Sequence, residues 1–216
     1  MTLQPPIVMN SAKNVSTAIA TFAAQQEKAQ RHRVLIAVAG APGSGKSTIA
    51  AAIAEMLGSR CCLIPMDGFH LDNSVLEERG LLPKKGAPET FDLDGFNQLI
   101  LDLKHRRTNI FPGFDRAADC VIEHGGIVPA DADILLFEGN YLLFDELGWS
   151  DLSQHWDASL WLKVTEGELE KRLIQRWLDH GLPEDQARLR ARSNDLVNAK
   201  RVIDRALPST WRLSNM

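Results

Sequence analysis

A run of glycines, a lysine and hydroxyl residues early in the chain has the spacing of a phosphate-binding loop. It contains the full pattern G-x-x-x-x-G-K-[ST], with an apolar run before it and a helical pattern after it, as this motif requires. Backbone N–H groups of such a loop curl around phosphate oxygens, the lysine reaches the β- and γ-phosphates, and the serine hydroxyl can bind Mg²⁺. We therefore expect ATP and Mg²⁺ as cofactors. The expected nucleotide site is Gly40, Ala41, Pro42, Gly43, Ser44, Gly45, Lys46, Ser47 and Thr48.

Two acidic residues directly follow apolar runs that read as buried strands. Asp67 comes after the run 61–66, and Glu138 comes after the run 134–137. The carboxyl edge of a parallel sheet is where ligands bind, so both acids should lie beside the phosphates. Asp67 can accept the proton of an attacking hydroxyl or hold a metal-bound water, and Glu138 takes the position of a Walker B acid. Asp67, Glu138 and Ser47 are thus the expected metal site; an Asp-Gly turn and an edge residue facing solvent are the simpler alternatives.

Arginines follow the last long apolar run of the chain. Arg172 and Arg176 share one face of a predicted helix with Glu168. They can close over the phosphates and offset negative charge during transfer, so both are candidate catalytic residues beside Lys46 and Asp67. Pairing with Glu168 on a solvated helix face is the equal alternative. Further candidates on the same lid are Arg188, Arg190 and Arg192.

Two predicted loops, 84–92 and 114–116, concentrate ionisable residues. Loops on a rigid scaffold commonly bind substrate, and basic residues there suit a polar or anionic acceptor. A surface loop without function is an equal alternative for each residue taken alone. The candidate substrate-binding residues are His70, Lys85, Glu89 and Arg116.

The order of elements that would position these residues alternates between strands and helices. Such alternation predicts an α/β protein with a P-loop NTPase fold, in which a doubly wound, mainly parallel sheet carries helices on both faces and a small helical lid. The expected strands are 34–39, 61–66, 134–137, 158–164 and a short last one at 202–203. The expected helices are 15–31, 46–57, 96–106, 166–180 and 184–200, and a hairpin is expected over 110–128.

The domain organisation that follows is a single kinase-sized domain behind a short N-terminal part. Residues 1–33 should form a tail and a packing helix, and 34–216 the nucleotide-binding domain. Within that domain, about 68–128 reads as an insertion on the acceptor side and about 168–195 as a lid.

Three ordered features resemble the family of phosphoribulokinase, uridine kinase and bacterial pantothenate kinase. They are Asp67-Gly68-Phe69 after the second strand, the stretch from Lys85 to Asp92, and Glu138-Gly139 after a buried strand. The resemblance covers roughly residue 34 to the C-terminus. It is most similar to a branch of kinase-like proteins labelled as nucleoside kinases or as associated with fructose transport.

The resemblance implies roles for residues already singled out. Asp67 would act as base toward the acceptor hydroxyl, Ser47 and Glu138 would organise Mg²⁺, and the region from Arg172 to Arg192 would close as a lid. The chain is shorter than pantothenate kinases, and Gly68 and His70 alter the uridine kinase pattern. A sugar, a sugar phosphate or another hydroxylated metabolite therefore stays open as acceptor.

Composition narrows the class of partner. The formal net charge of the 216-residue chain is −4. This charge argues against nucleic-acid binding, which needs a basic surface. Three cysteines are too few for a disulfide framework, and neither an export signal nor a membrane-spanning run is expected. We expect a cytoplasmic protein, monomer or homodimer, that meets a small-molecule acceptor, no nucleic acid and no membrane.

Together these features favour a kinase that moves the γ-phosphate of ATP onto a hydroxyl of a small metabolite. The alternative is a P-loop ATPase switch or assembly factor that hydrolyses nucleotide with the same Lys46, Ser47 and Glu138. Asp67 counts against that alternative, because a hydrolytic switch does not need an acid on the acceptor side.

Overall fold

The computed structural model describes residues 5–26, 33–146 and 148–215 of the chain. Its centre is a six-stranded sheet with the order β1-β8-β7-β2-β6-β3, and every neighbouring pair of strands is parallel. The expectation of a doubly wound, mainly parallel sheet is therefore confirmed. The strands are β1 (Ile7–Met9), β2 (Val34–Gly40), β3 (Cys61–Pro65), β6 (Ile134–Gly139), β7 (Ala158–Lys163) and β8 (Trp211–Ser214).

Unbroken apolar runs explain the central strands. Every residue of β2 and of β6 is buried, as expected of strands that are covered on both faces. In register, Val38 of β2 lies opposite Glu138 of β6, and Pro65 of β3 lies opposite Glu138 from the other side. Three strand ends therefore meet at one edge of the sheet, which is the edge that carries the phosphate-binding loop.

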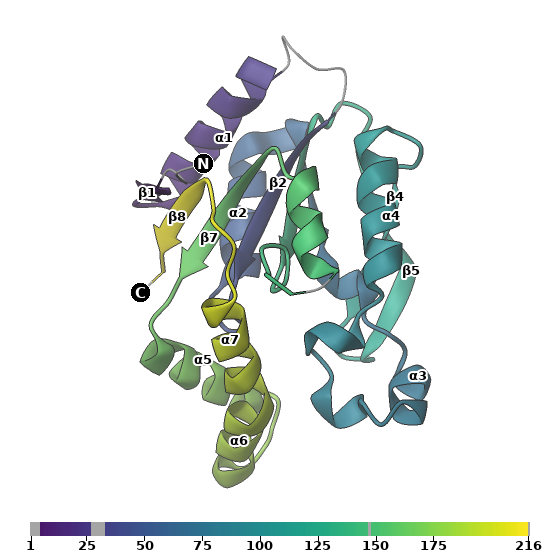
Figure 1. Ribbon diagram of the computed structural model, residues 1–216, viewed down its shortest axis with the longest axis vertical. Helices are drawn as coiled ribbons and strands as arrows, with labels where there is room; N and C mark the ends of the chain where they lie inside the picture. Colours follow the sequence, from purple (N-terminus) through teal and green to yellow (C-terminus); the bar gives the residue numbers. More distant parts are fainter. Residues whose placement is uncertain (1–4, 27–32, 147, 216) are drawn as a thin grey trace.

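Helices cover both faces of this sheet (Figure 1). On one face, α1 (Ala12–Gln26) and α2 (Lys46–Leu57) pack through Val15, Ile19 and Ile53. On the other face, α4 (Leu93–Lys104) and the 3₁₀ helix Trp149–His155 bury an aromatic-rich cluster. The predicted helix 15–31 is present as α1, although its last residues lie outside the described part of the chain. No helix among the described residues is long and apolar enough to cross a membrane.

The insertion between β3 and β6 contains the expected hairpin. Strands β4 (Ile110–Asp115) and β5 (Cys120–Ile127) pair antiparallel in a separate two-stranded sheet. The hairpin sits directly on the 3₁₀ turn Met66–Phe69: a Cβ on Gly68 would lie 2.4 Å from the carbonyl oxygen of Pro112. The remaining short helices of this region are α3 (Asn73–Glu78), Leu82–Lys84 and Pro88–Thr90.

Three helices near the C-terminus, at the lower left of Figure 1, contain the segment expected to be a lid, and we call them the lid helices. They are α5 (Glu166–Asp179), α6 (Glu184–Arg190) and α7 (Leu196–Asp204), with the π-helical turn Ala191–Asp195 between the last two. The predicted strand at 202–203 is wrong. Val202 is buried against the main core as part of the amphipathic helix α7, and the last strand is β8.

Candidate active site

The phosphate-binding loop takes the conformation that its glycines allow. Gly43 and Gly45 have φ angles of 78° and 83°, in the left-handed region that other residues rarely adopt. Gly45 also passes close to the end of the chain, because a Cβ there would lie 2.6 Å from Nδ2 of Asn215. Helix α2 begins at Lys46, so the loop presents the N-terminus of a helix, which favours phosphate.

Lys46 is held inside the loop by polar partners. Its side chain is 7% exposed, and Nζ donates to the carbonyl oxygen of Ala41 at 3.2 Å and to Oδ1 of Asn140 at 2.6 Å. Oε1 of Glu138 lies 4.0 Å from Nζ. Burial lowers the pKa of Lys46, and the charge of Glu138 opposes that shift. These contacts place an ammonium group at the mouth of the loop, within reach of bound phosphates.

Ser47 and Glu138 bring two oxygen ligands together. Ser47 Oγ donates to Oε2 of Glu138 at 3.2 Å, and the Glu138 side chain is 10% exposed. Burial raises the pKa of Glu138, while Lys46 opposes the rise. Hydroxyl and carboxylate oxygens fit Mg²⁺, which binds through one or two carboxylates together with substrate phosphates. The described residues contain no group of three or more His, Cys, Asp or Glu that could hold a metal by itself.

Asp67 follows β3 at the start of the acceptor side. Its Oδ2 forms an ion pair with Nη2 of Arg116, which lies in the turn of the β4–β5 hairpin. The backbone carbonyl of Asp67 accepts a hydrogen bond from Nδ1 of His70 at 2.8 Å. Three residues that were predicted separately, Asp67, His70 and Arg116, are thus direct neighbours.

The His70 ring is held between two phenylalanines. Its centroid lies 4.1 Å from that of Phe91 and 4.6 Å from that of Phe114. Burial lowers the pKa of His70, so the neutral imidazole is favoured. The result is a wall of three mutually tilted rings beside Asp67.

Lys85 anchors the tip of the hairpin. Its Nζ donates to Oδ1 of Asn73 at 2.6 Å, to Oδ1 of Asp119 at 2.8 Å and to the carbonyl oxygen of Asp119 at 3.2 Å. The same ammonium lies 5.1 Å from the ring centroid of Phe114. Because an ammonium group has three N–H donors, these contacts occupy all of them.

The two lid arginines predicted as catalytic differ in their surroundings. Arg176 pairs with Asp195 of the π-helical turn at 2.9 Å, and Asp195 also accepts from Nε1 of Trp177 at 2.5 Å. Arg172 pairs with Glu168 at 2.8 Å and donates to the carbonyl oxygen of Ser44 at 3.4 Å. Arg176 lines the cavity described next, while Arg172 does not line it and ties the lid to the loop through the Ser44 carbonyl.

A cavity of about 820 Å³ lies between the loop, the hairpin and the lid. Its acceptor half, as we use the term, consists of Asp67, His70, Lys85, Phe91, Phe114, Arg116 and Asp119. Of the predicted site residues, the cavity is lined by Pro42, Gly43, Gly45, Lys46, Ser47, Thr48, Asp67, His70, Lys85, Arg116, Glu138 and Arg176.

Five predicted site residues do not line the cavity: Gly40, Ala41 and Ser44 of the loop, and Glu89 and Arg172 outside it. Several lining residues were not predicted. Glu89 pairs with Nη1 of Arg201 at 3.0 Å, and neither Glu89 nor Arg172 is among the residues that line the cavity. Asn140 could have been found from its place two residues after Glu138 at a strand end. Phe91 and Phe114 lie in the two loops expected to bind substrate, although only the ionisable residues there were singled out. Helical spacing assigned Trp177 to the core face of its helix, and spacing gave no role in the site to Asp195.

Comparison with known proteins agrees with this arrangement. A family described as Phosphoribulokinase / Uridine kinase family matches residues 35–180. A Schizosaccharomyces pombe protein named "Putative uridine kinase" is 38% identical over 182 residues, which cover 78% of this chain and 77% of the relative. A pantothenate kinase of Listeria monocytogenes is 31% identical over 160 residues, 70% of this chain but only 52% of the relative.

A solved structure extends the likeness to three dimensions. The crystal structure of a "putative fructose transport system kinase" from Silicibacter sp. TM1040 superposes with a TM-score of 0.85 at 47% identity, covering 92% of this chain and 98% of the other. The fold is that of the P-loop NTPases, as expected. With most of its length matched in sequence and nearly all of it in structure, the chain belongs to the phosphoribulokinase / uridine kinase family of P-loop kinases.

Proposed function

We propose that this protein is an ATP-dependent kinase that transfers the γ-phosphate to a hydroxyl of a small metabolite. One observation carries the proposal: Asp67 lines the same cavity as Lys46, Ser47 and Glu138, with an aromatic and basic wall beyond it. A site for nucleotide hydrolysis alone needs only the phosphate side. The acceptor half supplies the second binding surface that a transfer reaction needs.

The transfer itself is an in-line displacement. The acceptor oxygen bonds to the γ-phosphorus as the bond from that phosphorus to the β–γ bridging oxygen breaks, and ADP leaves. The hydroxyl proton passes to the carboxylate of Asp67. Lys46 offsets negative charge on the β- and γ-phosphates, and Mg²⁺ held by Ser47 and Glu138 would add to that neutralisation.

The lid contributes charge and excludes water. Arg176 lies on the cavity side of α5, and Asp195 orients its guanidinium. Closing a lid over the phosphates strengthens electrostatic interactions and protects the phosphoryl group from hydrolysis. Arg172, bonded to the backbone of the loop, keeps α5 in place for that role.

The proposal is tested by ADP release from Mg-ATP with a panel of nucleosides, sugars, sugar phosphates, pantothenate and glycerate. Asp67→Asn should lower acceptor-dependent release by about 10²–10⁴-fold, because the base is lost, while ATP affinity stays within a few-fold. Asp131→Asn changes an exposed acid in a loop remote from the cavity and should behave like the wild type. Release that needs no acceptor and is equal in all three proteins would favour an ATPase switch instead.

A further inference from the structure

The two basic residues of the acceptor half are not equally available to a ligand. Lys85 is 12% exposed and has given all three of its N–H donors to Asn73 and Asp119. Arg116 is 65% exposed and has one acidic partner among the described residues, Asp67. A guanidinium carries five N–H donors, so Arg116 can bind a further acceptor group while it stays beside Asp67.

The hairpin turn holds Arg116 in this position. Oδ1 of Asp115 accepts hydrogen bonds from the backbone N–H groups of Ala117 at 2.8 Å and Ala118 at 2.9 Å. At the other end of the turn, Asp119 adopts a φ of 51° and is bound by Lys85. The backbone of the turn is therefore fixed on both sides of Arg116, and the ion pair with Asp67 holds its guanidinium beside that carboxylate.

Four cationic side chains of the cavity each lie beside an acidic one before any substrate binds, while a fifth, Arg190, donates to the carbonyl oxygen of Pro83. Lys46 lies next to Glu138, Lys85 next to Asp119, Arg176 next to Asp195, and Arg116 next to Asp67. The last pair cannot survive the proposed reaction unchanged. When Asp67 takes the hydroxyl proton it becomes neutral, and Arg116 loses its counter-charge at the moment of transfer.

We propose that the acceptor itself carries an anionic group, a carboxylate or a phosphate, which binds Arg116 while its hydroxyl binds Asp67. This inference rests on the kinase function proposed above and specifies its substrate class. A guanidinium binds either anion through two parallel N–H···O bonds. The anion replaces Asp67 as the partner of Arg116 during proton transfer, and it fixes the hydroxyl beside the base. A neutral metabolite offers Arg116 no such partner.

Matched acceptors that differ only in the anionic group test the proposal. Suitable pairs are fructose and fructose 6-phosphate, ribose and ribose 5-phosphate, and glycerol and glycerate, so that the phosphate and carboxylate arms are separate. In the pair with the higher kcat/KM values, we expect the anionic member to have a kcat/KM at least about tenfold above that of the neutral member. A factor of this size corresponds to one charge-assisted hydrogen bond. Equal kcat/KM for neutral and anionic members would overturn the inference and leave the kinase function standing.

Variants of Arg116 show whether the preference comes from this residue. In Arg116→Ala the ratio of anionic to neutral kcat/KM should fall toward one, mainly through KM, and Arg116→Lys should restore part of it. Arg79→Ala removes an exposed arginine that does not line the cavity and should keep the wild-type ratio. If Arg116→Ala lowers both members equally, Arg116 serves the transferred phosphoryl group and the inference is wrong.

A binding measurement makes the test independent of which metabolite is the true acceptor. With Mg²⁺ and a non-hydrolysable ATP analogue bound, the γ-phosphate position is filled. Added inorganic phosphate or malonate, at constant ionic strength, should then raise the Tm of the wild type and of Arg79→Ala by the same amount. The rise should be at least halved in Arg116→Ala. An equal rise in all three proteins would overturn the inference, whatever the activity assay gives.

Discussion

At the scale of single residues, Lys46 shows how tightly charge is arranged around the phosphates. Lys46→Ala should lower the turnover of ATP by about 10²–10³-fold, because one preorganised charge facing the phosphates is lost. It also leaves Glu138, whose pKa is already raised by burial, without its nearest counter-charge. ADP release measures the first effect. Lys13→Ala, on the exposed side of α1, is the control, and unchanged turnover in Lys46→Ala would remove the loop from the mechanism.

Burial of His155 makes the free energy of unfolding depend on pH. The ring is 8% exposed, its Nε2 lies 2.6 Å from Oδ1 of Asn97, and burial followed by the charge of Lys104 lowers its pKa. The folded state therefore binds a proton less readily than the unfolded state. Stability from His155 is present above the unfolded pKa of about 6.5 and is lost as pH falls through the lower folded value.

Urea unfolding at a series of pH values checks this prediction. The free energy of unfolding should decline below about pH 6.5, and His155→Asn should reduce the steepness of that decline. His70 acts in the same direction, since burial lowers its pKa as well, so the decline should not vanish. His124→Asn, on the exposed strand β5, should keep the wild-type steepness; equal steepness in both variants would exclude His155 as a source.

The residues that sequence alone could identify are defined by local sequence, either by spacing within one segment or by position directly after an apolar strand. The phosphate-binding loop is a contiguous segment, so its ligands follow from spacing, and Asp67 and Glu138 follow from their place after apolar strands. The partners of these residues are set by tertiary contacts. The sequence names Arg116 and Lys85 as equivalent basic candidates, but only the structure distinguishes a lysine with three occupied donors from an exposed arginine.

At the scale of elements, the contact between the hairpin and the 3₁₀ turn Met66–Phe69 positions the acceptor half. Gly68→Ala would place a Cβ 2.4 Å from the Pro112 carbonyl oxygen, so backbone must move. We expect a loss of about 1–3 kcal/mol in the free energy of unfolding and a higher KM for the acceptor, because Arg116 moves with the hairpin.

Gly167→Ala is the matched control for that change. Gly167 lies in the first turn of α5, and a Cβ there would have no neighbour within 4 Å. Alanine at this position should leave stability unchanged or raise it by up to about 1 kcal/mol, because it restricts the unfolded chain. Equal effects of the two substitutions on the free energy of unfolding would show that the hairpin shifts away from residue 68 at little cost and does not position the site.

Prediction of the strands succeeded for the central strands of the sheet and for the hairpin, and failed for the shortest strands at the edge of the sheet. Strands β2, β6 and β7 are long apolar runs, and their existence follows from composition. Strands β1 and β8, of three and four residues, carry too little pattern to be recognised. The pair at 202–203 was read as a strand because both residues are apolar, yet a short apolar pair suits a helix face equally well.

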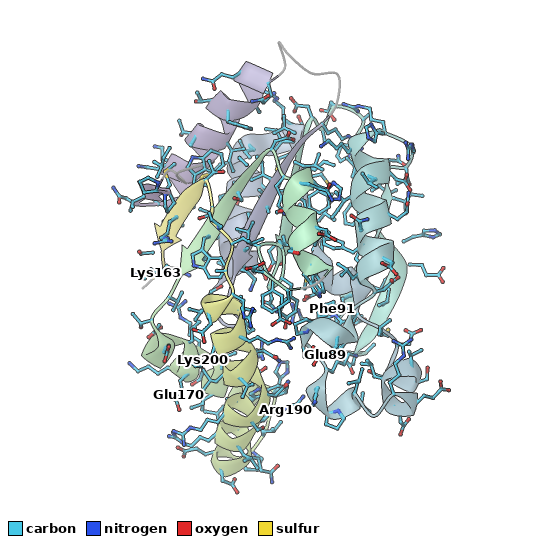
Figure 2. All side chains as sticks on the ribbon, in the orientation of Figure 1. Glu89, Phe91, Lys163, Glu170, Arg190 and Lys200 are labelled. Atoms are coloured by element: carbon cyan, nitrogen blue, oxygen red, sulfur yellow. The ribbon has the colours of Figure 1, made fainter. Side chains whose placement is uncertain are left out.

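At the scale of the whole molecule, contacts between the lid and the acceptor side close the cavity. Nη1 of Arg190 donates to the carbonyl oxygen of Pro83 at 3.0 Å, and Nδ2 of Asn194 donates to that of Lys85 at 3.3 Å. In Figure 2, Arg190 lies on the side of α6 that faces the segment carrying Glu89. Glu89 itself pairs with Arg201 of α7. Its position suggests that it joins the lid to the acceptor side and does not contact substrate.

Substitution of Arg190 tests this closure and leaves the phosphate-binding loop and Lys46 unchanged. Its guanidinium lies 5.3 Å from the ring centroid of Trp177 and bonds across to Pro83, so it bridges the lid and the opposite wall. Arg190→Ala should loosen the closed state and admit water to the bound nucleotide. We therefore expect the fraction of ADP formed without a phosphorylated acceptor to rise by about 3- to 10-fold, while the free energy of unfolding changes by less than about 1 kcal/mol.

Measuring ADP and phosphorylated acceptor in the same reaction gives that fraction directly. Arg188→Ala, two residues earlier in α6 and paired with Glu184, should leave the fraction at its wild-type value. If both variants keep ADP and product in the wild-type proportion, water is excluded by the walls of the cavity and not by the lid.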